Sequence, residues 1–309
     1  MAIKNSLAIN SLEFCEKLTQ ELDKVATQSS VTGFLEDSAF RSKFVGAKTI
    51  LIPEVGMSAL ADYDRDTGYT RGSITVTNTP FTLQMDRGRF FMLDEFDQEE
   101  TGLANLIGSV LSEFVRTQVA PEMDAYVLSK LAGVANDNGQ TVAPGTDAIS
   151  TLQELLLNVQ EETGYGNEEL VAFVDRTFYA ALMNSPSVSR QLVLSDFSKG
   201  GLNTRVKSLD GCALLPVTST RMKTAYDFLD GTTSGQEDGG FKPTSTAKSI
   251  RCLVMPKHGS AHLVKKAERT KIYTPEQVID FDGYRLNARY YYDLFVKNSK
   301  KGTIWACVE

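Results

Sequence analysis

KTILIPEVGMSALADYDRDTGYTRGSITVTNTPFTLQM, residues 48–85, holds two strand-like runs separated by a polar tip, and it decides the fold. In the second run apolar residues alternate with threonines, and the step Thr79-Pro80 shifts the phase, which predicts a bulge or bend. The tip contains Asp-Thr-Gly and Arg-Gly steps that favour turns. The stretch therefore predicts a long β-hairpin. Because its threonine-rich faces bury little core and an isolated hairpin is marginal in water, we expect it to lie on another chain.

The sequence that follows predicts an unusually long helix. Apolar residues recur at helical spacing through residues 103–133, LANLIGSVLSEFVRTQVAPEMDAYVLSKLAG. Asp97 and Glu100 resemble a capping box and place acids at the positive end of the helix dipole. At 1.5 Å per residue the helix is expected to be roughly 50 Å long, more than a compact domain of this size needs. Pro121 removes one hydrogen bond of the helix and predicts a kink.

The remaining elements predict an α+β chain. Residues 11–27 form an amphipathic pattern that must dock either on its own domain or on a neighbour. Residues 147–164 predict a helix that ends at Gly164, and residues 176–185 predict a shorter one. The other predictions are buried strands at 170–175, 211–219 and 249–257, a Gly- and Ser-rich surface loop at 229–248, and a C-terminal hairpin that turns at Asn298–Gly302.

Composition limits the function of this 309-residue chain. Apolar residues make up 42%, no run of 18 apolar residues exists, and the start lacks the pattern of a secretory signal, so we expect a folded cytosolic protein that does not enter a membrane. Residues 1–200 carry 15 basic and 28 acidic side chains, whereas residues 201–309 carry 17 basic and 11 acidic ones. This asymmetry suits head-to-tail contacts between copies, although two domains of different composition also explain it. The net charge of −7 argues against a sequence-reading DNA-binding protein.

Residues that could carry chemistry are few, and none is predicted to be catalytic or to bind a cofactor or metal. The four cysteines lie far apart, which fits neither a zinc cluster nor a redox motif, and Cys252 and Cys307 fit buried strands. His258 and His262 lie in PKHGSAHLVKK, where the flanking lysines favour ordinary loop or strand positions over metal binding. A metal-dependent hydrolase that uses these histidines and the acids of residues 94–100 is the alternative from another class.

An acidic cluster leads into the long helix. It could form a carboxylate pair for acid–base work or a site for a hard metal ion. We favour helix capping combined with salt bridges to Arg87 and Arg89, because the favourable interaction of acidic side chains with the helix dipole already explains acids at the start of a helix. The members of the cluster are Asp94, Glu95, Asp97, Glu99 and Glu100.

Three stretches resemble the major capsid proteins of tailed double-stranded DNA bacteriophages. Residues 44–101 resemble that family's extended loop with its flanks, and residues 103–133 resemble its spine helix, including an Ala-Pro-Glu step. Residues 209–222 and 247–298 resemble the core strands of the axial domain and the return into the peripheral domain. No single motif is diagnostic, but together the stretches cover more than half of the chain in the family's order.

The resemblance implies the Hong Kong ninety-seven fold, with an N-terminal arm, an extended β-hairpin loop, a peripheral domain with a long spine helix, and an axial domain with a central mixed sheet. The expected boundaries are 1–43 for the arm with its amphipathic helix, 44–95 for the extended loop and flanking strands, 96–145 for the spine helix of the peripheral domain, 146–255 for the axial domain, and 256–309 for the return strands and a C-terminal hairpin.

The resemblance also implies a structural protein that is not an enzyme. Copies are expected to form hexamers and pentamers of an icosahedral head around packaged double-stranded DNA, in a virion assembled in the cytoplasm of a bacterial host. The expected partners are other copies, a scaffolding protein, the portal and, where one exists, a decoration protein, with DNA held without sequence preference. The alternative is a nanocompartment (encapsulin-like) shell of the same fold, which encloses enzyme cargo.

Contacts between copies are expected on the extended loop and its flanks, where arginines can form bidentate pairs with acids of the next copy. Some members of the family join subunits by an isopeptide bond between a loop lysine and an asparagine. Residues 49–129 contain no lysine, although Asn78 is present, so we do not expect such a bond from this hairpin. The candidate contact residues are Arg65, Arg71, Arg87, Arg89, Asp64, Asp66, Asp94 and Glu95.

Overall fold

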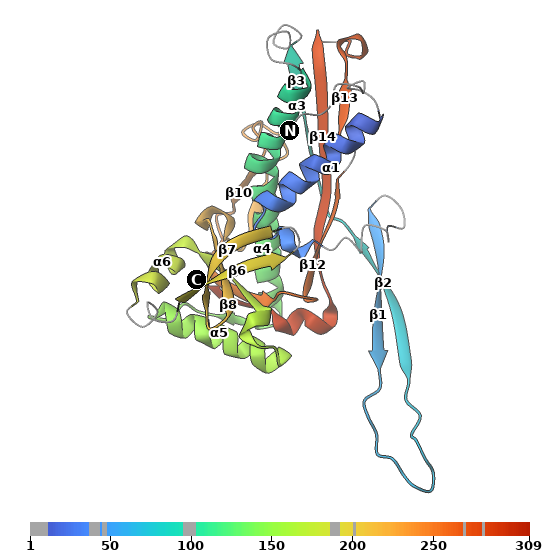
Figure 1. The fold of residues 1–309 in the computed structure, drawn as a ribbon, viewed down its shortest axis with the longest axis vertical. Coiled ribbons are helices and arrows are strands. Elements are labelled where there is room, and N and C mark those ends of the chain that lie inside the picture. The colour runs from blue at the N-terminus through green and yellow to red at the C-terminus, as the bar shows by residue number, and fades with distance from the viewer. Residues whose placement is uncertain are drawn as a thin grey trace.

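The chain folds into a two-lobed body from which one β-hairpin projects (Figure 1). The structure is a computed structural model. No helix among the described residues is long and apolar enough to cross a membrane. The described residues are 12–36, 44, 48–94, 103–185, 192–199, 202–267, 270–279 and 282–309.

A mixed seven-stranded sheet forms the first lobe. Two neighbouring pairs, β5 with β8 and β15 with β4, are parallel, and the other pairs are antiparallel. Helices α5 (Ala148–Thr163) and α6 (Arg176–Asn184) cover one face through an apolar cluster. The strand order is β4 (Thr141–Val142), β15 (Trp305–Val308), β11 (Ile250–Pro256), β5 (Leu170–Asp175), β8 (Cys212–Val217), β7 (Leu202–Leu209) and β6 (Leu192–Lys199).

Helix α5 begins and ends at the predicted residues for identifiable reasons. The side chain of Asp147 accepts a hydrogen bond from the Ile149 N–H, which satisfies one of the free donors at the helix start. Gly164 adopts φ 68°, a left-handed conformation that glycine reaches without a steric penalty. The predictions for the strands at 170–175, 211–219 and 249–257 are also confirmed, because β5, β8 and β11 lie there.

The second lobe is built on the long strand β14 (Gly283–Val296). Strand β3 (Met85–Asp94) pairs along one side of it, and β12 (Ala261–Ala267) and β13 (Lys271–Tyr273) pair along the other. One continuous helix runs along this sheet and confirms the predicted long helix. Its parts are α3 (Leu103–Phe114), the π-helical turn Val115–Val119 and α4 (Ala120–Asp137).

The helix changes type immediately before Pro121. Residues Val115–Val119 form the π-helical turn, and Pro121, which has no N–H to donate, follows it directly as the second residue of α4. A π-helical turn is one of the local features that accompany bends in helices. The kink predicted at Pro121 stays a prediction, and the structure adds a change in backbone hydrogen bonding at the same place.

Helix α1 (Leu12–Ser29) docks on its own chain. Phe14, Leu18 and Leu22 are buried in the same core as the long helix and β14. Asp124 of α4, which is 0% exposed, holds the turn after α1, because it accepts hydrogen bonds from the hydroxyl groups of Ser30 and Thr32 at 2.6 and 2.7 Å. Of the two possibilities that the sequence left open for this helix, its own domain is the observed one.

One local prediction is wrong, the C-terminal hairpin. β15 does not pair with β14, because the 3₁₀ helix Asn298–Thr303 directs the chain into the seven-stranded sheet, where β15 lies between β11 and β4. No C-terminal hairpin therefore forms. The surface loop predicted at 229–248 is confirmed, because this stretch is mostly turns and has no buried residue; within it the short strand β10 (Phe241–Pro243) pairs with β9 (Tyr226–Phe228).

Candidate functional site

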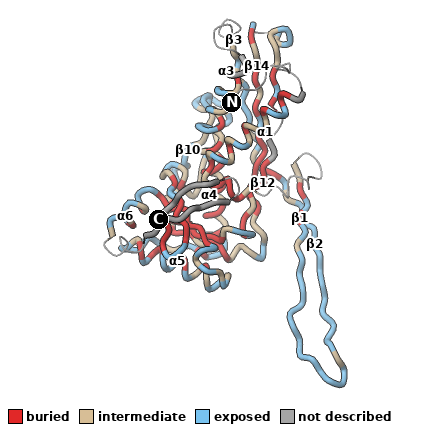
Figure 2. Tube along the Cα trace, in the orientation of Figure 1, coloured by how far each residue is buried: buried red, intermediate tan, exposed pale blue. Residues whose placement is uncertain are grey.

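The projecting hairpin consists of β1 (Thr49–Met57) and β2 (Ile74–Thr82), paired in an antiparallel register that runs unbroken from Thr49 opposite Thr82 to Met57 opposite Ile74. The bulge predicted at Thr79-Pro80 is therefore absent. Each strand of a two-stranded sheet has a free edge, and a proline, which has no N–H to donate, is tolerated there. Figure 2 shows the hairpin as a largely exposed element attached to a buried body.

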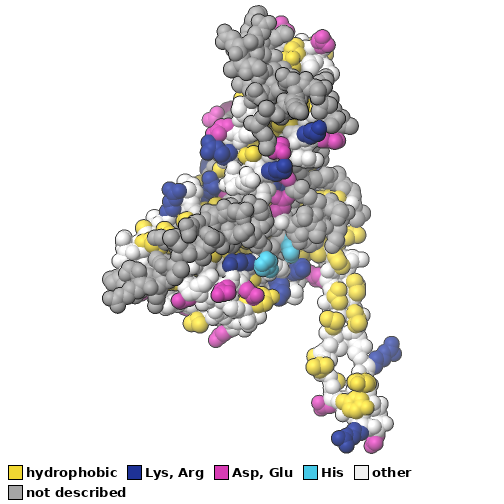
Figure 3. All heavy atoms as spheres, in the orientation of Figure 1, with side chains coloured by type: hydrophobic (Ala, Val, Ile, Leu, Met, Phe, Trp, Pro, Cys, Tyr) yellow, Lys and Arg dark blue, Asp and Glu magenta, His cyan; other side chains and the backbone are white. Residues whose placement is uncertain are grey.

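One face of the hairpin is apolar. Residues directly opposite each other in an antiparallel pair share a face, and every second residue along a strand returns to it. Val55 lies opposite Val76 and Met57 opposite Ile74, so these four side chains form one continuous surface. Their exposed fractions are 58% for Val55, 62% for Val76, 75% for Met57 and 72% for Ile74. We call this surface the apolar face, and Figure 3 shows hydrophobic side chains gathered on the hairpin.

The opposite face changes character along its length. Near the body it carries Ile50, Ile52 and Phe81, which pack with Tyr291 and Phe295 of β14 in a small separate core. Farther out the same face carries threonines and Gly56, and it is exposed. Along β2, this face carries threonines in its outer part and the partly buried Phe81 near the body. The change from polar to apolar residues on the same face explains why the apolar positions of the sequence shift by one residue at Thr79-Pro80.

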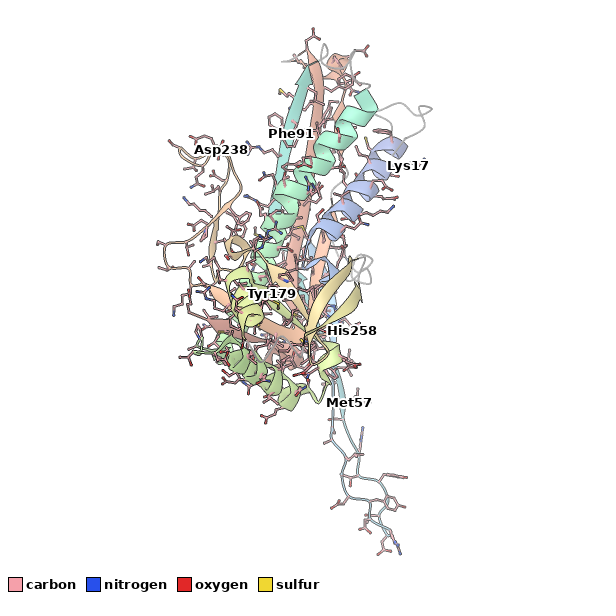
Figure 4. All side chains as sticks on the ribbon, turned by 60° about the vertical axis from the view of Figure 1, so that its left-hand side comes forward. Lys17, Met57, Phe91, Tyr179, Asp238 and His258 are labelled. Carbon is pink, nitrogen blue, oxygen red and sulfur yellow. The ribbon has the colours of Figure 1, made fainter. Side chains whose placement is uncertain are left out.

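The concentration of exposed apolar residues is specific to the hairpin. Eight of the twelve large apolar side chains that are exposed among the described residues belong to residues 51–76. Exposed apolar surface of this extent marks an interaction site in soluble proteins. Figure 4 labels Met57 on the hairpin, away from the body that carries Phe91 and Tyr179.

The hairpin tip holds four of the predicted contact residues. Asp64 accepts a hydrogen bond from the Asp66 N–H at 2.9 Å and closes a small turn with Gly68. Hydrogen bonds from the Asp66 and Thr67 region lower the pKa of Asp64, which therefore stays charged at neutral pH. Arg65, Asp66 and Arg71 are exposed beside it. The rings of Tyr63 and Tyr69 lie 4.8 Å apart and give the tip a compact form.

Arg87 lies inside the subunit, and this corrects the prediction that it reaches an acid next door. Its guanidinium binds the Glu122 carboxylate of the long helix with two hydrogen bonds of 2.7 and 3.2 Å, and it also donates to the carbonyls of Leu229 and Gly240. The hydroxyl of Tyr292 donates to the same carboxylate at 3.0 Å. Arg87 thus pairs with Glu122 and not, as the sequence had predicted, with the acidic cluster. The two residues are far apart in the sequence, and no local pattern indicates that they pair.

Arg89 also binds within its own chain. It donates to the carbonyl oxygens of Asp238 at 3.0 Å and Glu237 at 3.3 Å, so it holds the 229–240 loop against β3. Gly239 has φ 69°, a left-handed conformation that favours glycine, and it lies beside the Arg89 guanidinium. Of the acidic cluster, only the backbone of Asp94 lies within the described residues, at the end of β3.

A second charged group sits where the hairpin meets the body. The carboxylate of Asp86 accepts hydrogen bonds of 2.8 Å from Arg289 and one of 2.7 Å from Lys48, the residue before β1. The hydrogen bond from Arg289 is the main cause that lowers the pKa of Asp86 to about 2, against the opposing effect of partial burial. The group stabilises the attachment of the hairpin while its carboxylate is charged.

The histidines of the hydrolase alternative do not converge on a metal-binding cluster. His258 lies at the turn between β11 and β12, and His262 lies on β12, opposite Phe295 of β14. Within the described ranges no group of three or more His, Cys, Asp or Glu side chains could hold a metal ion. All four cysteines are buried and none forms a disulfide, and burial raises the pKa of Cys212 to about 12, which keeps this thiol protonated.

The fold resembles solved shell proteins, although the sequence does not. No family model and no curated protein matches the chain. The capsid protein of the cyanophage P-SCSP1u superposes with a TM-score of 0.54 at 11% identity, covering 86% of this chain and 84% of the phage protein. The subunit of a virus-like particle from Pyrococcus furiosus superposes with a TM-score of 0.53 at 9% identity, covering 96% of this chain and 100% of that one.

A third solved structure with the same fold is the SrpI encapsulin from Synechococcus elongatus PCC 7942. It superposes with a TM-score of 0.51 at 12% identity, covering 85% of this chain and 82% of the encapsulin. Similarity at this level of identity shows the fold alone, here with its long helix and mixed central sheet. The chain therefore has the Hong Kong ninety-seven fold, an α+β fold that it shares with phage capsid proteins and an encapsulin.

Proposed function

We propose that the chain is the subunit of a closed protein shell and has no catalytic role. The observation that carries this proposal is the apolar face, which is exposed on the single chain and lies on an element too thin to bury it internally. In a shell built from identical subunits, every subunit has a neighbouring copy that can cover its apolar face. The fold, shared with solved capsid and encapsulin subunits, supports the same conclusion.

We propose further that the shell is the head of a tailed phage, built from hexamers and pentamers around double-stranded DNA. Support comes from the resemblance of residues 44–133 to phage capsid segments and from the phage capsids among the structural matches. Scaffolding and portal proteins are the expected partners. The encapsulin match favours the alternative of a nanocompartment with enzyme cargo.

The tip residues Arg65, Arg71 and Asp66 remain our candidates for ion pairs between copies, because they are exposed. Each exposed pair contributes about 0–1 kcal/mol, so these pairs select the register of the contact more than they stabilise it. The larger contribution comes from burial of the apolar face, at roughly 25 cal/mol per Å².

The test is sedimentation velocity with negative-stain microscopy on the expressed chain, with and without a candidate scaffolding protein. Closed shells, tubes or capsomers are the expected result. A monomer or dimer under all conditions contradicts the proposal. Nuclease-protected DNA in particles from the natural source identifies a phage head, whereas an enclosed enzyme identifies a nanocompartment.

A further inference from the structure

At its β2 end the hairpin joins the body through two residues, Leu83 and Gln84, which link β2 to β3. Leu83 is buried, and its N–H donates to the carbonyl of Lys48 at 2.9 Å, which keeps the two strands together at the base. The N–H of Gln84 donates to the carboxylate of Asp293 at 3.2 Å. The direction in which the hairpin leaves the body is thus connected to one side chain of β14.

Asp293 is a fully buried carboxylate with donors from two other parts of the fold, the residue Gln84 and helix α4. Besides Gln84, it accepts hydrogen bonds from the hydroxyl of Tyr126 at 2.7 Å and from the ammonium of Lys130, and both residues belong to α4. Burial, together with the nearby carboxylate, raises the pKa of Tyr126 well above its usual range, so its hydroxyl stays a donor.

Lys130 contacts the hairpin as well as the carboxylate. Its ammonium lies 5.6 Å from the ring centre of Phe81 on β2 and 5.5 Å from that of Tyr126. Phe81 in turn packs edge-on against Phe295, with ring centres 5.3 Å apart. The last residues of β2 are therefore held between the long helix and β14 by one ion pair and its neighbouring rings.

We propose that Asp293 and Lys130 are positioning residues that set the direction of the hairpin and link it to the long helix. A buried charge that loses its partners is strongly unfavourable, so the carboxylate keeps its donors when the structure moves. Because those donors come from α4 and from the hinge residue Gln84, a displacement of the helix is passed to the hairpin. The inference goes beyond shell formation, which requires only that the apolar face be exposed.

Asp124 provides a matched control within the same chain. It is also 0% exposed, and it also binds a cation, Arg221, at 3.0 Å. Its other donors belong to residues 30–32 after α1, and none belongs to the hairpin. Loss of this carboxylate perturbs a buried charged group of the same kind without touching the hinge.

The experiment measures the distance between the hairpin tip and the body by pulsed electron resonance on nitroxide labels at Thr67→Cys and Ser150→Cys, both exposed positions. The four native cysteines are buried. Dilute, unassembled full-length chain is used, so the result does not depend on whether shells form. The variants are Lys130→Met, Asp293→Asn and the milder Tyr126→Phe, with Asp124→Asn as the control.

The proposal predicts a broader and displaced distance distribution for Lys130→Met and Asp293→Asn, a smaller broadening for Tyr126→Phe, and an unchanged distribution for Asp124→Asn. If Asp293→Asn fails to fold, the other two hinge variants decide the matter. Distributions equal to that of the parent chain in the hinge variants overturn the proposal. So does equal broadening in the Asp124→Asn control, because it would report general loosening.

Discussion

Strands β2 and β5 differ more in their surroundings than in their sequences. β5 reads LVAFVD and is buried at all six positions, between helices on one face and the long helix on the other. β2 reads ITVTNTPFT, is also rich in β-branched residues, and is exposed over most of its length. Both are good strand sequences. The first finds its partners inside the chain, whereas we propose that the second finds them on a neighbouring copy.

This difference separates the residues that stabilise the subunit from those that serve assembly. A substitution in β5 should unfold the chain, and one on the outer part of β2 should leave the folded subunit intact. The following changes test that separation, ranked by the expected loss of subunit stability.

Phe173→Ala should have the largest effect, a loss of about 3–5 kcal/mol in the free energy of unfolding, because it opens a cavity in a fully buried strand. Phe173 is 0% exposed and stacks on Phe34 at a ring-centre distance of 5.9 Å. Urea unfolding followed by circular dichroism measures the loss. A change below about 1 kcal/mol would mean that this core collapses around the gap and that the contrast between the strands is overstated.

Asp124→Asn should cost about 3 kcal/mol, because it leaves the Arg221 guanidinium and the donors of residues 30–32 without their charged acceptor. The same unfolding assay applies, and limited proteolysis should show earlier cleavage near α1. Protection of α1 equal to that in the parent chain would contradict the role given to this carboxylate.

Asp86→Asn should cost about 1 kcal/mol at neutral pH, after allowance for the exposure of its partner Arg289. The pKa of Asp86 is about 2 in the folded chain, below its ordinary value of 3.8, so folding favours the charged form. This contribution is complete above about pH 4 and disappears as the pH falls toward 2. Unfolding of both proteins across that range should therefore show the difference shrinking with acidification, and a difference independent of pH would refute the assignment.

No covalent joining of copies is expected from the hairpin, which contains no lysine. Boiled and denatured shells should run as monomers on a gel. A ladder of oligomers would show that another part of the chain supplies a cross-link.

Much of the fold was predictable because its signals are local. The capping Asp147, the stop at Gly164 and the apolar stripe of the long helix each act within a few residues. The hairpin and its exposure also followed from local pattern, since a threonine-rich strand pair has little to bury on itself. The resemblance to phage capsid proteins then supplied the order of the elements.

The failures involve partners far apart in the sequence. Arg87 pairs with Glu122 and Asp293 with Lys130, and nothing in either local sequence indicates the other partner. β15 joins β11 and β4 because the 3₁₀ helix before it redirects the chain, although the flanking strands alone resemble a hairpin. The apolar face could not be predicted from the sequence for a related reason: only the register between β1 and β2 shows that Val55 and Val76 lie on the same face.

The most direct test compares Val76→Asp with Thr75→Asp, neighbouring exposed residues of β2 that point to opposite faces of the hairpin. Both variants should keep the unfolding free energy of the parent chain within about 0.5 kcal/mol, because both positions are on the surface of the subunit. Sedimentation velocity of the assembling protein then gives the decisive result. We expect Val76→Asp to stay as unassembled subunits while Thr75→Asp still forms shells. Shells formed equally well by Val76→Asp would contradict the claim that the apolar face of the hairpin binds the neighbouring copy.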